Sequence, residues 1–153
     1  MTKYFKLIGG ISLLGYAGRV LYVDLTTGNT RTEKLSEETA KKYIGGIGLG
    51  MKLWLTHSKA GVEPLSPENP LVLALGPVSA TMFPTGGNGH AFISKSPATN
   101  GVGEAVSHGT FGAELKRAGY DAVILEGKAE KPVYLWIDDD SVQLLDASQV
   151  WGK

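Results

Sequence analysis

The sequence has 153 residues, of which 42% are hydrophobic, and it carries 15 basic and 15 acidic residues. This length favours one domain with its own core, and the balanced charge without a basic stripe argues against a nucleic-acid-binding protein. The absence of cysteine excludes disulfides, thiolate catalysis and cysteine-ligated metal clusters within the chain. Glycine contributes 21 residues, which indicates either close backbone approaches or many tight turns.

Residues 1–14 are expected to form an N-terminal extension ahead of a single domain at residues 15–153. Lys3 and Lys6 precede the apolar run Leu7–Leu14, but glycines interrupt that run and the cleavage-site pattern is poor, so a signal peptide is disfavoured. No stretch reaches the ~20 apolar residues that a membrane span needs. We therefore expect a cytoplasmic protein that does not contact a membrane.

The first predicted element is a β-hairpin, in which an apolar strand at Arg19–Leu25 returns through a polar turn as an exposed strand at Thr30–Leu35. Ser36 can cap a following helix that carries two glutamates in its first turn. The glycines in Gly45–Gly50 then either allow close helix packing or present backbone to a cofactor. Their spacing does not match a dinucleotide-binding fingerprint.

Five further strands and one helix are predicted in the rest of the chain. The predicted segments are Leu71–Leu75, which is apolar throughout, His90–Ser94, a helix at Thr110–Ala118, Asp121–Glu126, and a hairpin formed by Val133–Ile137 and Val142–Leu145. Gly119 is placed to end the helix, and the acidic run between the last two strands reads as a solvated turn. The few, short helices predict an α+β fold, and the similar order of elements in the two halves indicates a duplicated unit.

The stretch from Pro77 to Gly119 is dense in Gly, Ser, Thr and Asn, and it contains the candidate binding residues. A glycine-rich loop before a strand, here Gly86, Gly87, Asn88 and Gly89, can direct several N–H groups at one anion. Lys95 and Ser96 follow. Phosphate contact and a plain strand end are both open interpretations of this pair, but a P-loop is rejected because its second glycine is missing and Pro97 prevents the helix.

A second candidate group, Ser107, His108 and Gly109, precedes the predicted helix, whose N-terminus favours anions. His108 could donate to a phosphate or to the edge of a pterin ring, or it could be a partly exposed capping residue. The three histidines lack metal-ligand spacing, and no nucleophile–base constellation is present.

Several stretches resemble the N-terminal domain of the aldehyde ferredoxin oxidoreductases, which are tungsten bis-pterin enzymes. These stretches are Gly18–Gly28, Tyr43–Leu49, Pro64–Asn69, Leu75–Pro77, Pro84–Gly87, Lys95–Pro97, Phe111–Leu115, Ala118–Ala122, Glu126–Val133 and Asp146–Lys153. Each is weak alone, but together they occur in order from about Gly15 to the last residue, and the ordered set is specific.

The resemblance implies a duplicated α+β domain of two β-sheets that forms the base under two tungstopterin (or molybdopterin) molecules with a bridging Mg²⁺. It also implies a neighbouring [4Fe–4S] cluster, electron transfer to ferredoxin and oxidation of an aldehyde to a carboxylic acid. Because the cluster cysteines lie in other domains of the family, this chain alone is expected to be inactive. Its expected partners are those domains, ferredoxin through them, and a second copy of itself, because a base domain in isolation exposes apolar surface.

The family's pterin-facing residues are only partly present. A basic residue usually follows Pro-Thr-Gly-Gly, and here that position is Asn88, or Gly89 after a one-residue insertion. The family's asparagine and glycine before the helix correspond to Val106 and His108. The backbone carbonyl of Val106 can still ligand Mg²⁺, since that contact needs no particular side chain. These departures leave a second hypothesis open, a stand-alone, non-catalytic module that binds pterin or phosphate or acts as an interaction scaffold.

Overall fold

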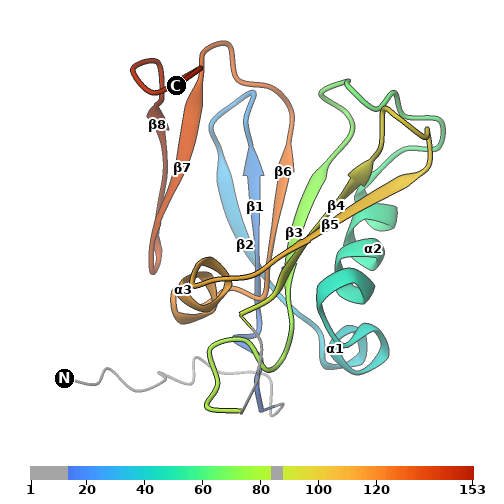
Figure 1. The fold of residues 1–153 in the computed structure, drawn as a ribbon, viewed down its shortest axis with the longest axis vertical. Coiled ribbons are helices and arrows are strands. Elements are labelled where there is room, and N and C mark those ends of the chain that lie inside the picture. The colour runs from blue at the N-terminus through green and yellow to red at the C-terminus, as the bar shows by residue number, and fades with distance from the viewer. Residues whose placement is uncertain (1–13, 84–87) are drawn as a thin grey trace.

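A computed structural model describes residues 14–83 and 88–153 (Figure 1). Its strands are β1 (Arg19–Asp24), β2 (Thr30–Lys34), β3 (Leu71–Leu75), β4 (His90–Lys95), β5 (Val102–Ser107), β6 (Ala122–Glu126), β7 (Val133–Asp138) and β8 (Ser141–Asp146), and its helices are α1 (Glu37–Tyr43), α2 (Gly46–His57) and α3 (Phe111–Arg117). Two sheets and three short helices confirm the α+β prediction. No helix in the described part of the chain is long and apolar enough to cross a membrane.

The larger sheet has six strands in the order β2-β1-β6-β3-β4-β5. Strands β1 and β6 run parallel, and every other neighbouring pair is antiparallel. The smaller sheet is the β7–β8 hairpin. The sheets thus differ in size, and the internal duplication stays a prediction.

Helices α1 and α2 cover one face of the six-stranded sheet (Figure 1). The buried side chains on this face include Val72, Ile93 and Ile124 from the sheet and Leu49 and Trp54 from α2. A Cβ atom at Gly50 would collide with the Ile93 side chain, so α2 lies unusually close to the sheet at this point. This contact supports the close-packing interpretation of the segment at Gly50.

The opposite face packs against α3 and the β7–β8 hairpin. Its fully buried residues include Leu21, Leu75 and Tyr120. Because β7 alternates between half-buried and exposed residues, one face of the hairpin meets the core while Tyr134 and Trp136 stay exposed on the other.

Most of the predicted elements are confirmed. Ser36 caps α1, with its side chain accepting a hydrogen bond from the Thr39 backbone N–H at 3.1 Å, and Gly119 follows α3 with φ +96°. The exception is β5, for which no strand was predicted. Five of its six residues are exposed, and only Gly103 is half-buried, so its sequence lacks the alternation that a half-buried strand shows.

Asn69 ties the loop before β3 to the helix and to β4. Its Oδ1 accepts from Trp54 Nε1 and from the Lys95 backbone N–H, both at 3.2 Å, and its Nδ2 donates to the Pro64 and Lys95 carbonyls at 2.7 and 3.2 Å.

We expect Asn69→Ala to lower the free energy of unfolding by about 2 kcal/mol, because the Trp54 Nε1–H and Lys95 N–H donors lose their acceptor. Denaturant titration followed by circular dichroism measures this. Gln143→Ala, on an exposed strand position, should cost under about 0.5 kcal/mol, and an equal loss in both variants would contradict the role of Asn69.

Tyr22 gives the fold a defined pH dependence at high pH. Burial, followed by the Glu33 carboxylate, raises the pKa of Tyr22 from 10.0 to about 12. A phenol with a raised pKa in the folded state stabilises the fold below pH 10 and loses that contribution as the pH rises through 12. Between pH 9 and 11.5 we expect the free energy of unfolding to fall by about 2 kcal/mol more in the wild type than in Tyr22→Phe. Identical falls in the two proteins would contradict the assignment.

Candidate functional site

The candidate residues at the start of β4 and the end of β5 lie together at one end of the six-stranded sheet. His90 is opposite Ser107 in the antiparallel β4–β5 pair, so the segments on either side of that pair are neighbours. A Cβ atom at Gly89 would lie 3.5 Å from two atoms of the His108 ring. The structure therefore brings together Asn88, Gly89, Val106, Ser107, His108 and Gly109. Gly86 and Gly87 lie outside the described residues.

The first turn of α3 packs closely against this group of residues. A Cβ atom at Gly112 would lie 2.9 Å from the Asn88 carbonyl oxygen and 3.3 Å from His90 Nδ1. Only glycine allows this approach, which sets the Asn88–Gly89 backbone directly against the first turn of the helix. Asn88 and His108 themselves remain exposed, so their backbone and side chains are accessible to a ligand.

The junction between α1 and α2 reaches the same end of the sheet. A Cβ atom at Gly45 would lie 2.6 Å from the Leu75 carbonyl oxygen and 2.9 Å from Gly76 Cα. Gly45 therefore lets the junction lie on the end of β3 and the start of the loop that leads to the candidate site. Sequence reasoning left the role of this glycine open, and the contact distances show that it packs closely against the end of β3.

Two buried polar residues hydrogen-bond to the backbone of Asn88 and Gly89. His90 is 6% exposed, and its Nδ1 lies 3.3 Å from the Asn88 carbonyl oxygen; because a carbonyl only accepts, this nitrogen carries the proton. Ser79 is 2% exposed and donates to the Gly89 carbonyl at 3.4 Å. Sequence reasoning did not assign either residue, although a histidine at the start of an apolar strand is the kind of signal that indicates a buried hydrogen bond.

The backbone of Val106 faces outward from the sheet. In an antiparallel ladder, residue pairs that are hydrogen-bonded to each other alternate with pairs that are not. The Ser96 N–H donates to the Gly101 carbonyl at 2.8 Å beside the β4–β5 turn, so Ser96 and Gly101 form a hydrogen-bonded pair. Counting along the register, Gly103, Ala105 and Ser107 bond to β4, whereas the N–H and C=O groups of Val102, Glu104 and Val106 point away from it. The Val106 carbonyl is thus oriented as an available oxygen ligand.

Lys95 and Ser96 lie at the other end of β4. The six-residue strand separates Lys95 from His90 by about 17 Å, so this pair and the Asn88–His108 group cannot contact the same small ligand group. Lys95 Nζ donates to the Val62 carbonyl at 2.7 Å, and Ser96 Oγ accepts from the backbone N–H groups of Ala98 and Thr99. The separation between Lys95 and His90 could have been predicted from the sequence, because a six-residue strand places its two ends far apart.

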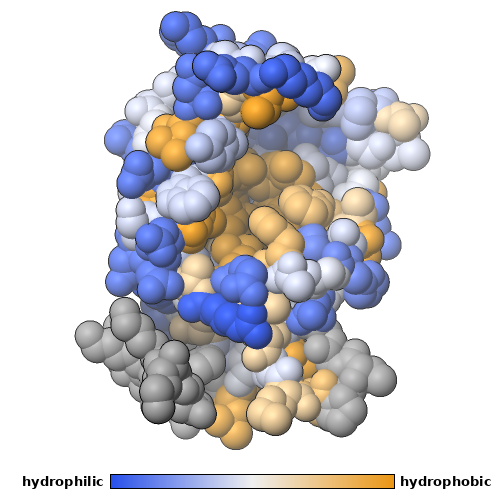
Figure 2. All heavy atoms as spheres, turned by 60° about the vertical axis from the view of Figure 1, so that its left-hand side comes forward, coloured by the Kyte–Doolittle hydropathy of each residue, from blue (hydrophilic) through white to orange (hydrophobic). Residues whose placement is uncertain are grey.

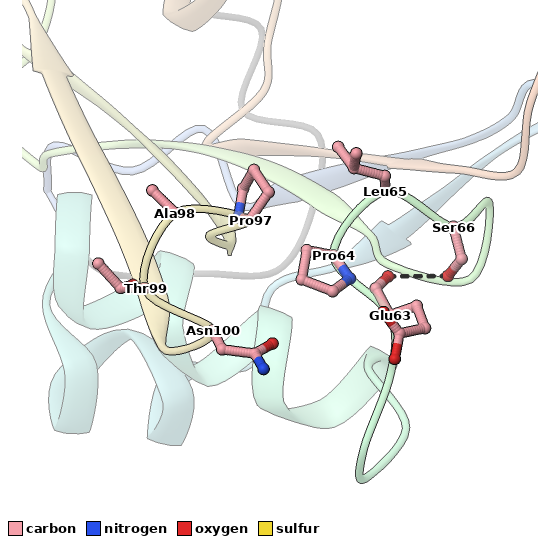
Figure 3. Close-up of a pocket in the computed structure, with 8 residues that line it drawn as sticks. All are labelled: Glu63, Pro64, Leu65, Ser66, Pro97, Ala98, Thr99 and Asn100. Atoms are coloured by element: carbon pink, nitrogen blue, oxygen red, sulfur yellow. Dashed lines mark hydrogen bonds between the residues drawn. The ribbon is translucent and has the colours of Figure 1, made fainter.

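An open cleft of about 560 Å³ lies beside Ser96, between two loops (Figure 3). One wall is formed by Glu63–Ser66 and the other by Pro97–Asn100. Ser66 Oγ donates to the Glu63 carbonyl at 2.9 Å, so this polar pair is satisfied within its own loop. The cleft has no cationic lining residue, which makes it a poor match for an anionic ligand.

The groups at the candidate site are hydrogen-bonding groups. In residues 14–83 and 88–153 no group of three or more metal-binding side chains gathers in one place. The ligand-accessible groups are backbone N–H and C=O groups, the Asn88 amide, the Ser107 hydroxyl and the His108 imidazole. This set suits a ligand that presents several hydrogen-bond donors and acceptors.

A buried ion pair holds the elements around the site in place, and sequence reasoning did not identify it. Lys116 of α3 and Asp121 are 4% and 0% exposed and bond to each other. Asp121 also accepts from the Ala17 and Gly18 N–H groups at 3.1 and 2.6 Å. Tyr16, which lies in the same segment ahead of β1 as Ala17 and Gly18, donates to the Ile44 carbonyl at 2.7 Å. Burial, followed by the Asp121 charge, raises the pKa of Tyr16.

The face of the sheet opposite α1 and α2 is only partly covered. Figure 2 shows an apolar hollow in the middle of this side of the molecule, bordered by hydrophilic residues. The half-buried apolar residues that pack against the core of this face are Leu25, Phe92, Ala118, Leu125, Leu135, Ile137, Val142 and Leu144. A hollow of this kind is typical of a surface that contacts a ligand or other polypeptide.

Comparison with known proteins assigns the chain to a family. The family model described as "Aldehyde ferredoxin oxidoreductase, N-terminal domain" matches residues 20–153. The tungsten-containing aldehyde ferredoxin oxidoreductase of Pyrococcus furiosus is 49% identical over 141 residues, which are 92% of this chain and 23% of that protein. The aliphatic sulfonate oxidoreductase, WOR-like subunit, of the same organism is 43% identical over 143 residues, which are 92% of this chain and 22% of that protein.

A solved structure is similar over most of the chain. The active site complex BamBC of benzoyl coenzyme A reductase in complex with 1,5-dienoyl-CoA superimposes with a TM-score of 0.87 at 37% identity, covering 92% of this chain and 21% of that one. The chain thus spans about a quarter of the length of the curated relatives it matches. With the family model covering nearly all of the described residues, the chain belongs to the aldehyde ferredoxin oxidoreductase N-terminal domain family.

Proposed function

We propose that this chain forms the base of a tungstopterin or molybdopterin site in an oxidoreductase that oxidises aldehydes to carboxylic acids with ferredoxin as electron acceptor. The observation that carries the proposal is the convergence of Asn88–Gly89 and Val106–Gly109 at one end of the sheet. Both segments were selected from sequence by their correspondence to pterin-facing positions, and the fold makes them neighbours.

The residues present fit such a cofactor mainly through their backbone. The outward Val106 carbonyl would serve as an oxygen ligand for Mg²⁺, and the backbone around Gly89 and Gly109, with the Asn88 amide, would hydrogen-bond pterin and phosphate. When bound, the metal–pterin group would supply the oxidation–reduction chemistry. The chain's own part would be to bind and orient that group. Its [4Fe–4S] cluster would be held by other domains, because this chain has no cysteine.

The apolar hollow supports the second half of the proposal, which is that the chain works against other domains. It lies on the face that α3 and the β7–β8 hairpin leave partly open (Figure 2). The remaining polypeptide, in the same chain or in a separate subunit, would cover this face. The exposed Tyr134 and Trp136 side chains extend the apolar surface onto the outer side of the hairpin.

His108 favours the alternative proposal of a non-catalytic module that binds pterin or phosphate or acts as an interaction scaffold. Its ring lies over Gly89 and takes up space at the centre of the candidate site. If the ring blocks the cofactor, His108→Gly should raise pterin loading several-fold. If the ring instead donates to the cofactor, the same substitution should lower it.

We expect His108→Gly to raise loading, because the exposed ring lies close to Gly89 and occupies space that a ligand there would need. Pterin is measured as its fluorescent oxidation product after acid release, and Val102→Ala, at the far end of the same strand, is the control that should leave loading unchanged. Equal loading in wild type, His108→Gly and the control would show that His108 does not face the ligand.

A chimera tests the proposed function as a whole. This chain replaces the matched 141 residues of the Pyrococcus furiosus relative, and tungsten, pterin and aldehyde oxidation with a ferredoxin-type acceptor are measured. We expect tungsten and pterin to be retained. A folded chimera that retains its iron–sulfur cluster but contains neither tungsten nor pterin would overturn the cofactor role.

A further inference from the structure

The peptide bond between Asn88 and Gly89 is held at its carbonyl group by buried residues. The Asn88 carbonyl oxygen accepts a hydrogen bond from His90 Nδ1 at 3.3 Å, and a Cβ atom at Gly112 would lie 2.9 Å from the same oxygen. His90 is 6% exposed, and Gly112 is buried in the first turn of α3. The Asn88 carbonyl therefore points into the interior, toward the His90 ring and the start of α3.

The direction of this carbonyl also sets the direction of the Gly89 N–H. A trans peptide bond is planar, so its C=O and N–H groups point in opposite directions, and the described residues contain no cis peptide bond. The Gly89 N–H is thus directed away from His90 and α3. Within residues 14–83 and 88–153 this N–H has no hydrogen-bond partner. Because Asn88 is exposed and Gly89 is half-buried, a ligand can approach the peptide.

The His90 ring is well placed to fix a neighbouring peptide, because the ring itself is held. Its centroid lies 5.2 Å from that of Phe111 in α3 and 5.6 Å from that of Phe92 in β4. The His90 backbone is paired on both sides, with Leu75 of β3 and Ser107 of β5. The residue is therefore anchored to the sheet and to the helix, and the bond from Nδ1 fixes the peptide relative to both.

We propose that His90 is a positioning residue, which holds the Asn88 carbonyl inward and so presents the Gly89 N–H to the ligand as a hydrogen-bond donor. Glycine adopts φ angles of either sign, so without the His90 bond the peptide can rotate and turn its carbonyl, an acceptor, toward the ligand. Ser79 cannot replace His90, because it donates at 3.4 Å to the Gly89 carbonyl, which belongs to the next peptide.

The orientation of this peptide determines which ligand atoms it can bind. An outward N–H suits an atom that accepts a hydrogen bond, such as a pterin carbonyl oxygen or a phosphate oxygen, whereas an outward carbonyl is itself only an acceptor and repels both. The identity of the ligand rests on the proposed function. The orientation of the peptide does not, since it is a property of this chain, and separate measurements therefore test the two.

The orientation is measured by NMR on the full-length chain. At about pH 8, where histidine is ordinarily neutral, long-range ¹H–¹⁵N spectra distinguish a ring proton on Nδ1 from one on Nε2, and we expect it on Nδ1. His90→Leu removes the donor, whereas His90→Asn keeps an N–H on the atom attached to Cγ. Residual dipolar couplings of the Gly89 N–H report the direction of the peptide, and we expect them to change in His90→Leu and to stay near the wild-type values in His90→Asn. A proton on Nε2, or unchanged couplings in His90→Leu, would overturn the inference.

The effect on binding is measured in the chimera with the Pyrococcus furiosus relative, as pterin released per folded chain. We expect about five-fold less pterin in His90→Leu than in the wild type, as the loss of one hydrogen bond implies, and a content within about two-fold of the wild type in His90→Asn. His57→Leu is the matched control, because it removes a histidine that bonds to Glu126 at 3.0 Å, away from the site, and it should leave loading unchanged. Equal loading in His90→Leu and wild type, or equal losses in His90→Leu and His90→Asn, would overturn the positioning role. A wild-type chimera without pterin would overturn the proposed function, whereas the dipolar couplings decide the orientation of the peptide.

Discussion

Replacing Asp121 by alanine is expected to lower the free energy of unfolding by about 3–5 kcal/mol, because it leaves the Lys116 ammonium buried without its partner. Lys116 is 4% exposed, and its other bond is to the Gly15 carbonyl at 3.1 Å. The substitution also removes the acceptor for the Ala17 and Gly18 N–H groups. The segment ahead of β1 would therefore lose its attachment to the residue that precedes β6. Chemical denaturation, followed by tryptophan fluorescence, measures the loss.

Two further variants separate the buried charge from the other effects of this change. Glu114→Gln removes an exposed ion pair with Arg117 on the same helix and should cost under about 0.5 kcal/mol. Combining Lys116→Met with Asp121→Asn removes both charges and should recover a large part of the loss. A loss below about 1 kcal/mol in Asp121→Ala, or no recovery in the double variant, would contradict the account of this pair.

Gly45→Ala is expected to destabilise the protein by about 3 kcal/mol. The new Cβ atom would lie 2.6 Å from the Leu75 carbonyl oxygen and 2.9 Å from Gly76 Cα, and backbone on both sides leaves no flexible side chain to move aside. Overpacking of this kind costs about 1–3 kcal/mol or more. The thermal unfolding midpoint, checked by denaturant titration, provides the measurement.

Gly76→Ala is the matched control for this prediction, because it adds the same methyl group to the segment against which Gly45 packs. Its Cβ would meet only Ser79 Oγ at 3.9 Å, which is ordinary contact. We expect its stability to stay within about 0.5 kcal/mol of the wild type. If both glycine variants lose the same stability, the close approach of the α1–α2 junction to the end of β3 is not what constrains Gly45.

The elements that local chemistry specifies could be predicted from the sequence. The two hairpins follow from apolar strands joined by polar turns, the start of α1 from Ser36, and the burial of β3 from its run of apolar residues. Strand β5 could not be predicted, because an exposed edge strand buries no face and so carries no alternation. The neighbourhood of β1 and β6 could not be predicted either, since these strands pair across about a hundred residues of sequence.

The candidate site was predictable in part for a related reason. The correspondence of Asn88 and Val106–Gly109 to family positions could be read from the sequence, and the fold brings these residues together. Lys95 was grouped with them because it is near in sequence, but an extended strand carries it about 17 Å away. The supporting contacts of His90, Ser79 and the Lys116–Asp121 pair depend on which segments meet in space, and no local pattern contains that information.

The most direct test of the central claim is the position of the cofactor in the chimera. Anomalous diffraction at a tungsten absorption edge locates the metal without reference to any expected contact. We expect the tungsten and its pterins against the end of the sheet that carries Asn88 and Val106–Gly109, with His108 beside the pterin. Cofactor density at the Lys95–Ser96 end, or density that contacts no residue of this chain, would contradict the account.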